Sequence, residues 1–323
     1  MTTRIVFLDR AIFANSVKLE APSFSHEWSD YPETKPHQVV ERLSGCKIAI
    51  SSKIPIKAPD MDLLPNLKMI AIAGTGTDHI DIEAATRKGI TVANLKGYAW
   101  RAVAEHAIAL SFSLARNLKS YGNAVAKGHW SDADAFCWHG GGEIRDLLNS
   151  CFAVFGRGAI GAEAGRLASL LGMNVIYAER RDAKHVRPNY VAFDEALAMA
   201  DVISLHCPLI DSTQGMIDES AFAKMNRKPI LINCGRGGLV NEMALVKALN
   251  EEQISGAGFD VLSKEPPDID DPNPFLKLAD LPNVIITPHV GWASGNAMQA
   301  AADMLISNIN AFQAGKPENV VVV

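Results

Sequence analysis

Three side chains suited to binding acids and moving protons each follow a short apolar run that is typical of a β-strand. Arg236 follows residues 230–233, Glu265 follows residues 256–261, and His289 follows residues 284–287. An arginine can grip a carboxylate with two parallel hydrogen bonds. A histidine can transfer a proton near neutral pH, and a neighbouring carboxylate can orient it. Each residue alone also fits a plain structural role, but their shared position at strand ends favours one common site.

A glycine-rich loop follows another apolar run, residues 152–155. It consists of Gly156-Arg157-Gly158-Ala159-Ile160-Gly161, and apolar residues at helical spacing come after it. In a Gly-x-Gly-x-x-Gly loop the first glycine permits a tight turn and the second lets a pyrophosphate approach, while the third lets helix and strand pack closely. The helix N-terminus then offers N–H groups to the phosphates. This context favours dinucleotide binding over a glycine turn in another kind of α/β protein.

The residues after the next apolar run, 174–177, bear on the kind of dinucleotide. Glu179 follows that run, roughly 20 residues beyond the loop, where a carboxylate can hold the adenosine ribose hydroxyls. A carboxylate repels the 2′-phosphate of NADP, so Glu179 favours NAD. Arg180 and Arg181 come next and could grip that phosphate instead, unless both are simply solvated. NAD is therefore the expected cofactor, with NADP as the alternative.

Apolar runs rich in valine and isoleucine alternate with helical patterns along the chain. The runs lack the polar alternation of a half-exposed sheet, which indicates parallel sheets covered by helices on both faces. The expected strands span residues 5–8, 47–51, 69–73, 91–95, 152–155, 174–177, 202–206, 230–233, 256–261 and 284–287. Long helices are expected over residues 100–119 and 296–314.

The length of 323 residues suits two domains. We expect an α/β fold of two doubly wound parallel-sheet domains. The dinucleotide-binding domain spans residues 100–292, and the second domain combines residues 1–99 with a C-terminal return over residues 293–323. Residues 128–142 are the least regular segment and suit a loop or an arm that packs on a partner.

Composition excludes several other classes of protein. Hydrophobic residues make up 48% of the chain, and the net charge is −5, so we expect no nucleic-acid partner. No apolar run approaches the roughly 18 residues of a membrane span, and the N-terminus lacks a signal-peptide pattern. The five cysteines are scattered without a Cys-x-x-Cys pair. We therefore expect no disulfide framework, no metal site and a cytoplasmic location.

Several segments together resemble the D-isomer-specific 2-hydroxyacid dehydrogenase family, most closely its glycerate dehydrogenase or hydroxypyruvate reductase branch. The resemblance extends over nearly the whole chain. Besides the glycine loop, it rests on Gly74-Thr75-Gly76-Thr77-Asp78-His79-Ile80-Asp81, Ala104-Glu105-His106, His206-Cys207-Pro208-Leu209, residues 233–237, residues 260–266 and Pro288-His289. It implies a Rossmann cofactor domain and a flavodoxin-like substrate domain.

The resemblance also implies an activity: hydride transfer between a nicotinamide cofactor and C2 of a small D-2-hydroxy or 2-oxo acid, with hydroxypyruvate or glyoxylate expected. Arg236 would bind and polarise the substrate, His289 would be the acid–base group, and Glu265 would pair with it. Gly74, Thr75 and Gly76 would bind the substrate carboxylate through backbone N–H groups. Cofactor contacts beyond the glycine loop, Glu179 and Arg180 are expected from His206, Cys207, Pro208, Thr213, Cys234, Gly235, Asp260 and Gly291.

The resemblance further implies a homodimer, formed through the cofactor domain with residues 121–144 as its arm. Two alternatives remain open from the sequence. One is an NAD(H)-sensing binding protein of the same fold, similar to corepressors that bind peptides and keep similar site residues. The other is a dehydrogenase for another 2-hydroxy acid, such as D-lactate or a phosphorylated acid.

Overall fold

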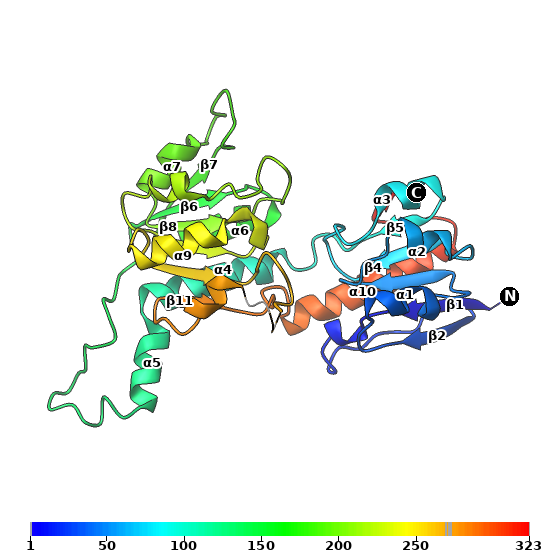
Figure 1. The fold of residues 1–323 in the computed structure, drawn as a ribbon, viewed down its shortest axis with the longest axis horizontal. Helices are drawn as coiled ribbons and strands as arrows, with labels where there is room; N and C mark the ends of the chain where they lie inside the picture. Colours follow the sequence, from blue (N-terminus) through cyan, green and yellow to red (C-terminus); the bar gives the residue numbers. More distant parts are fainter. Residues whose placement is uncertain (1, 269, 271–272, 323) are drawn as a thin grey trace. The chain divides into compact units, whose positions relative to one another are not determined.

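Two compact units make up the chain. The computed structural model describes residues 2–268, 270 and 273–322. Unit 1 comprises Met1–Ala99 and Ala293–Val323, and unit 2 comprises Trp100–Trp292. Each unit has a six-stranded sheet of its own with helices packed against it (Figure 1). The expected α/β class is confirmed.

The sheet of unit 1 has a flavodoxin-like order. Its strands are β1 (Thr3–Phe7), β2 (His26–Asp30), β3 (Ile48–Ser51), β4 (Met69–Ile72), β5 (Thr91–Ala93) and β12 (Val320–Val322). They lie in the order β12-β5-β4-β3-β1-β2. The first five strands are parallel and follow the order 2-1-3-4-5 that is typical of flavodoxin-like folds. β12 pairs with β5 in the antiparallel direction.

The two edge strands of unit 1, β2 and β12, are the ones that the apolar runs did not predict. β2 has the sequence HEWSD, and none of its residues is fully buried. β12 is only three residues long. β2 is an edge strand and is covered less than a central one, so it needs no continuous apolar run, whereas β12 is apolar but too short to predict a strand. The pairing of these segments is therefore decided by the sheet that they join.

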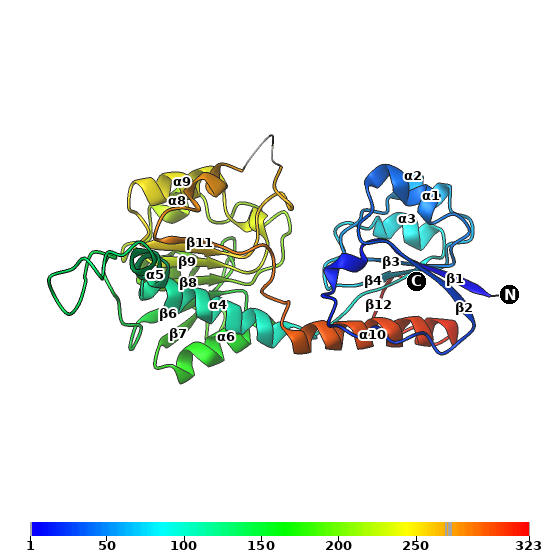
Figure 2. The ribbon, with the colours of Figure 1, turned by 90° about the horizontal axis from the view of Figure 1, so that it is seen from below.

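Helices cover both faces of the unit 1 sheet. They are α1 (Val39–Arg42), α2 (Ala58–Asp62), α3 (Ile82–Arg87) and α10 (Gly295–Gln313). Figure 2 shows α1, α2 and α3 on one face and α10 on the other. Ser294 caps α10, because its side chain accepts a hydrogen bond from the backbone N of Ala297 at 3.2 Å. The bounds of α10 agree with the predicted helix to within one residue.

Unit 2 contains a dinucleotide-binding type of sheet. Its strands are β6 (Cys151–Phe155), β7 (Asn174–Ala178), β8 (Val202–Leu205), β9 (Ile230–Asn233), β10 (Gly256–Phe259) and β11 (Val284–Ile286). They are all parallel and lie in the order β11-β10-β9-β8-β6-β7. A parallel bridge from Ala178 to Val191 extends the sheet beyond β7. The strand order reverses between β6 and β8, which is where α/β sheets bind their ligands.

The helices of unit 2 include one departure from the prediction. They are α4 (Trp100–Ala115), α5 (Leu118–Ala126), α6 (Ala159–Leu170), α7 (Phe193–Met199), α8 (Glu219–Phe222) and α9 (Glu242–Asn250). The single helix expected over residues 100–119 is wrong, because the chain breaks at Asn117, which has a φ of +51°. The Asn117 side chain donates to the carbonyl O of Glu143 and thereby fixes this turn.

Short 3₁₀ helices lie in both units, at Arg10–Ile12, Pro36–Gln38, Gly237–Leu239 and Pro274–Leu278.

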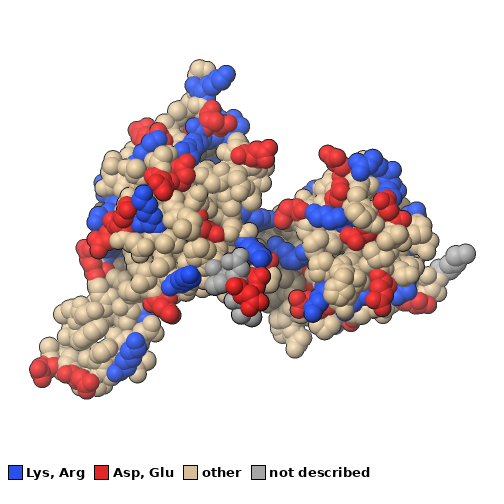
Figure 3. Space-filling model, viewed as in Figure 1, with Lys and Arg blue, Asp and Glu red and all other residues tan. Residues whose placement is uncertain are grey.

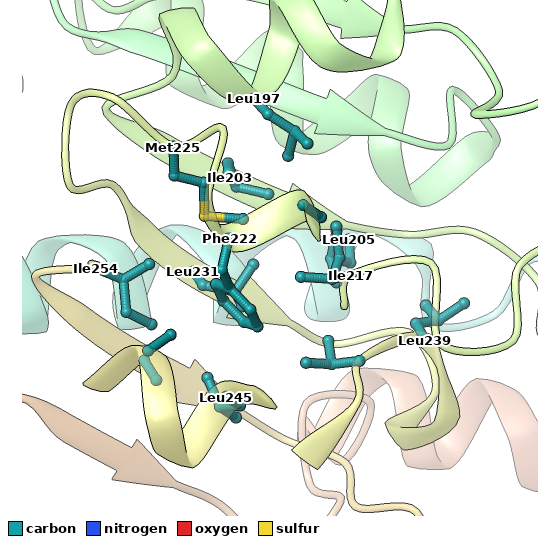
Figure 4. Close-up of a cluster of buried hydrophobic side chains, with 14 of the residues drawn as sticks. Leu197, Ile203, Leu205, Ile217, Phe222, Met225, Leu231, Leu239, Leu245 and Ile254 are labelled. Carbon is teal, nitrogen blue, oxygen red and sulfur yellow. The ribbon is translucent and has the colours of Figure 1, made fainter. Parts of the chain in front are cut away.

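A buried apolar cluster holds the strands of unit 2 in place. Ile203 of β8 and Leu231 of β9 pack with Leu197, Phe222 and Leu245 from three surrounding helices (Figure 4). All five are at most 2% exposed, and burying such side chains contributes about 1.5–3 kcal/mol each. This packing fixes the positions of the strand ends that carry the candidate site.

Charged side chains of both signs are interspersed over the face shown in Figure 3. Of the helices in the described part of the chain, none combines the length and the hydropathy that a membrane span requires.

Candidate active site

The loop between β6 and α6 has the shape that phosphate binding needs. Gly156 has a φ of +99°, and a Cβ atom there would lie 2.8 Å from the backbone N of Cys207. A Cβ atom on Gly161 would lie 2.0 Å from the carbonyl O of Gly156, so only glycine fits where α6 packs on the loop. Gly158 faces open space, because a Cβ atom there would meet no atom within 4 Å. The loop thus leaves room at the positive end of the α6 dipole, which suits a pyrophosphate.

Glu179 follows β7, and its carboxylate is engaged within its own loop. The residue is 3% exposed, and the Nε and Nη2 atoms of Arg187 donate to its two carboxylate oxygens at 2.5 and 2.7 Å. These bonds from Arg187 hold the pKa of Glu179 at about 2. Arg181 is bound elsewhere, because its Nη1 donates to Asp218 at 2.8 Å. Sequence reasoning missed Arg187, since no spacing rule pairs it with Glu179.

Arg236, Glu265 and His289 follow β9, β10 and β11, which are neighbours in the sheet. Parallel strands place their carboxyl ends at one edge, so all three residues belong to the same edge of unit 2. Asn233 shapes the turn that carries Arg236, because its Nδ2 donates to the carbonyl O of Arg236 at 3.0 Å. A Cβ atom on Gly237 would lie 1.9 Å from the backbone of Leu262. The Arg236 turn therefore packs directly on the segment that leads to Glu265.

His289 and Glu265 are in direct contact. The Nδ1 atom of His289 lies 2.7 Å from the Oε2 atom of Glu265, and the two side chains are 27% and 29% exposed. The backbone N of Leu262 donates to the other oxygen of Glu265 at 2.8 Å, which orients the carboxylate. Because Nδ1 is engaged by Glu265, Nε2 is the ring nitrogen of His289 that could exchange a proton. An imidazole held in this way can act as a general acid or a general base.

Asp260 supports the turn that carries His289. Its carboxylate accepts hydrogen bonds from the Thr287 hydroxyl at 2.6 Å and from the backbone N atoms of Val290 and Gly291 at 2.9 and 2.8 Å. Its carbonyl O accepts one from the backbone N of His289 at 2.9 Å. His289 has a φ of +55°, a region that non-glycine residues rarely adopt. Sequence reasoning missed this supporting function of Asp260.

The loops after β8 and β9 contribute groups that are unsuited to acid–base chemistry. Burial lowers the pKa of His206 to about 4, so its imidazole is neutral at physiological pH. Burial raises the pKa of Cys207 to about 11 and also raises that of Cys234, so both remain thiols. The Thr213 hydroxyl donates to the carbonyl O of Pro208 at 2.7 Å and thereby closes the loop.

In unit 1, residues 74–76 follow β4, and buried amides hold them. The Nδ2 atom of Asn94 donates to the carbonyl O of Thr75 at 2.7 Å. Asn308 of α10 donates to the carbonyl O of Asn94 at 3.1 Å and accepts from Asn319 at 2.8 Å. Sequence reasoning missed these amides, because the bond between Asn308 and Asn94 links positions 214 residues apart.

Unit 2 thus combines a dinucleotide-binding loop with a histidine–carboxylate pair at the ends of neighbouring strands. A cofactor in this fold carries the redox chemistry, while side chains at the strand ends bind the substrate and move its proton. The fold and the site together define a nicotinamide-dependent oxidoreductase.

Comparisons with known proteins narrow this class. Residues 108–291 match the family model of the D-isomer specific 2-hydroxyacid dehydrogenase, NAD binding domain. A glycerate dehydrogenase from Methylorubrum extorquens is 45% identical over 99% of both chains. A hydroxypyruvate reductase from Blautia hydrogenotrophica is 34% identical over 89% of this chain and 88% of its own. The solved structure of an NADPH-dependent glyoxylate/hydroxypyruvate reductase from Sinorhizobium meliloti is 27% identical, with a TM-score of 0.80 over 99% of this chain and 97% of its own.

The chain belongs to the D-isomer-specific 2-hydroxyacid dehydrogenase family. It is an NAD(P)-dependent oxidoreductase of small 2-hydroxy acids. The family resemblance, the enzyme class and the nicotinamide cofactor that the sequence predicted are confirmed.

Proposed function

We propose that this enzyme reduces hydroxypyruvate or glyoxylate to the corresponding 2-hydroxy acid, which for hydroxypyruvate is D-glycerate. The observation that carries the proposal is the 2.7 Å contact between His289 and Glu265, at the sheet edge to which Arg236 also belongs. This arrangement suits an acid–base group beside a carboxylate-binding cation. The glycerate dehydrogenase and the hydroxypyruvate reductase described above support the choice of substrate.

Each residue has a distinct function in this proposal. Arg236 binds the 2-oxo acid and polarises its carbonyl group, while Gly74, Thr75 and Gly76 of unit 1 bind a carboxylate through backbone N–H groups. When bound, the nicotinamide cofactor supplies the hydride for C2. His289 donates the proton to the C2 oxygen from Nε2, and Glu265 holds the ring in place through Nδ1.

Unit 2 binds the dinucleotide, and unit 1 is the substrate-binding unit. The glycine loop, Gly156 to Gly161, binds the pyrophosphate at the N-terminus of α6. The other cofactor contacts that we assign lie after the strands of unit 2, at His206, Cys207, Pro208, Thr213, Cys234, Gly235, Asp260 and Gly291.

A panel of small 2-oxo acids tests this function. Purified enzyme is assayed with hydroxypyruvate, glyoxylate, pyruvate and a phosphorylated 2-oxo acid, each with NADH and with NADPH. We expect the highest kcat/KM for hydroxypyruvate or glyoxylate and a D-configured product from hydroxypyruvate. The matched control, His289→Gln, should lose most turnover but still bind the cofactor. Preference for pyruvate or for the phosphorylated acid would assign the enzyme to another substrate.

We also propose that the enzyme is a homodimer, with residues 121–144 as the dimerisation arm. Apolar side chains are exposed along this arm: Val125 is 54% exposed, Trp130 is 52% and Phe136 is 90%. An exposed apolar surface of this kind is typical of a protein interface. The arm is also ordered internally, because Trp130 Nε1 donates to the carbonyl O of Phe136 at 2.9 Å and the rings of His129 and Trp138 stack.

A cytoplasmic location completes the proposal. Cys46, Cys137, Cys151, Cys207 and Cys234 are all free thiols, which suits a reducing compartment. The acidic net charge of −5 is consistent with an enzyme that has no nucleic-acid partner.

A further inference from the structure

The carboxylate of Glu179 is saturated by donors from its own loop. Its Oε1 atom accepts hydrogen bonds from the backbone N of Arg180 at 2.8 Å and from Arg187 Nη2 at 2.7 Å. Its Oε2 atom accepts two more from Arg187, from Nε at 2.5 Å and from the backbone N at 3.2 Å. A carboxylate has about four acceptor sites. Glu179 therefore has no site left for the ribose hydroxyls unless Arg187 moves away.

Arg187 is well placed to keep this position. The bridge between Ala178 and Val191 closes the loop that contains it, and the Arg187 guanidinium lies 4.0 Å from the ring centroid of Tyr190. The Arg187 side chain is half-exposed at 52%, whereas the Glu179 side chain is 2% exposed. A bidentate arginine pair of this kind is stronger than an ordinary hydrogen bond and offsets the carboxylate charge.

A second cation, Arg180, lies beside the Glu179 carboxylate, whose charge Arg187 compensates. Arg180 Nε is 3.9 Å from Glu179 Oε1, and the Arg180 side chain is 75% exposed. Arg181 differs, because it is bound to Asp218 and to the Ser220 hydroxyl, the latter at 2.7 Å. The chain thus presents Arg180 and Arg187 against one carboxylate at the end of β7. The net positive charge of these two arginines and one carboxylate favours binding of an anionic 2′-phosphate over binding of uncharged ribose hydroxyls.

We propose that Arg187 sets the cofactor preference of this enzyme by occupying Glu179, so that NADPH is accepted alongside NADH and Arg180 binds its 2′-phosphate. This inference rests on the proposed binding of NAD(P) by unit 2. It changes the meaning of Glu179: a free carboxylate at this position would repel the phosphate and select NAD, but a carboxylate paired with Arg187 does not. Arg187 acts through Glu179 and is a positioning residue.

Equilibrium binding tests the proposal without turnover. Dissociation constants for NADH and NADPH are measured by nicotinamide fluorescence on the full chain, for wild type and for Arg187→Ala, Arg187→Lys and the double variant Glu179→Gln/Arg187→Ala. Arg181→Ala is the matched control, since it removes a neighbouring arginine that is bound to Asp218. Thermal unfolding of each cofactor-free variant reports whether the loop change affects folding.

For wild type we expect the two dissociation constants to agree within about tenfold, since an arginine–phosphate contact is a strong, charge-assisted hydrogen bond. Arg187→Ala exposes the carboxylate, so the ratio of the NADPH to the NADH constant should rise by about tenfold or more. The double variant removes that charge and should restore the wild-type ratio. Arg187→Lys keeps the charge but loses the fork, and its ratio should lie between those of wild type and Arg187→Ala. Arg181→Ala should keep the wild-type ratio.

Two results would overturn the inference: wild type that binds NADPH more than about a hundredfold more weakly than NADH, or an unchanged ratio in both Arg187 variants. If neither cofactor binds to wild type, the proposed dinucleotide site of unit 2 fails as well. If both cofactors bind as expected but no 2-oxo acid is reduced, the assignment of Arg187 stands and the proposed substrate fails.

Discussion

At the residue scale, the charge of Glu265 lies next to the imidazole that donates the proton in the proposed reduction. Glu265 Oε2 is 2.7 Å from His289 Nδ1, and a carboxylate at that distance orients the ring through a charge-assisted hydrogen bond. Glu265→Gln keeps the shape and removes the charge. In this variant we expect kcat for reduction to fall by about tenfold or more, because a neutral amide holds the His289 ring less firmly than a charged hydrogen-bond partner does.

The reverse reaction provides the control for this prediction. In the proposed mechanism oxidation uses the same His289 ring as its base, so Glu265→Gln should lower kcat for oxidation as well. An unchanged kcat in both directions, with chemistry shown to be rate-limiting, would remove Glu265 from the mechanism.

Arg236 is the second residue whose chemistry can be tested alone. Arg236→Lys keeps the positive charge but loses the planar fork that grips a carboxylate bidentately. We expect kcat/KM for the 2-oxo acid to fall by about tenfold or more, with both kcat and KM affected. The dissociation constant of NADH should barely change. An equal loss of NADH binding would place Arg236 in the cofactor site.

At the scale of elements, two glycines in the loop between β6 and α6 allow folding stability and cofactor binding to be tested separately. Gly161→Ala places a Cβ atom 2.0 Å from the Gly156 carbonyl O, so the backbone must shift and the free energy of unfolding should fall by about 1–3 kcal/mol. Gly158→Ala adds a methyl group in open space. Its stability should fall by at most about 1 kcal/mol, because alanine is only a weaker N-cap.

Cofactor binding distinguishes the two glycines. The Gly158→Ala methyl group occupies the room that we assign to the pyrophosphate, so NADH should bind about tenfold more weakly or worse. Denaturant unfolding and NADH titration on both variants check this prediction. Unchanged NADH binding in a folded Gly158→Ala variant would move the phosphate site away from the N-terminus of α6.

At the scale of the whole molecule, the arm over residues 121–144 predicts the assembly. Wild type should have about twice the chain mass of 34.8 kDa by light scattering, as expected of a homodimer. Phe136→Asp places a charge on the most exposed apolar side chain of the arm, at 90%, and should weaken the dimer by about tenfold or more. Leu63→Asp alters a side chain of unit 1 that is 66% exposed and should leave the mass unchanged. A monomeric wild type would refute the dimer.

The sequence by itself determined the elements whose signals are local. Strands covered on both faces require continuous apolar runs, and every expected strand is present in the structure. The glycine loop could also be predicted from the sequence, because close packing at Gly161 and room for a pyrophosphate at Gly158 each require a glycine at a set position. The position of Arg236, Glu265 and His289 at one sheet edge followed from the parallel direction of their strands.

Only the tertiary structure decided which polar groups pair. Arg187 reaches Glu179, Asn308 reaches Asn94 and Asp260 holds the His289 turn. The partners lie 8, 214 and 30 residues apart in the sequence, so no single spacing rule relates them. The edge strand β2 likewise lacks an apolar run, since none of its residues is fully buried. The spacing of residues along the sequence indicates only which residues are neighbours within one helix or strand. The polar pairs named above form only after the chain has folded. For that reason Glu179 could be located from the sequence, but its neutralisation by Arg187 could not.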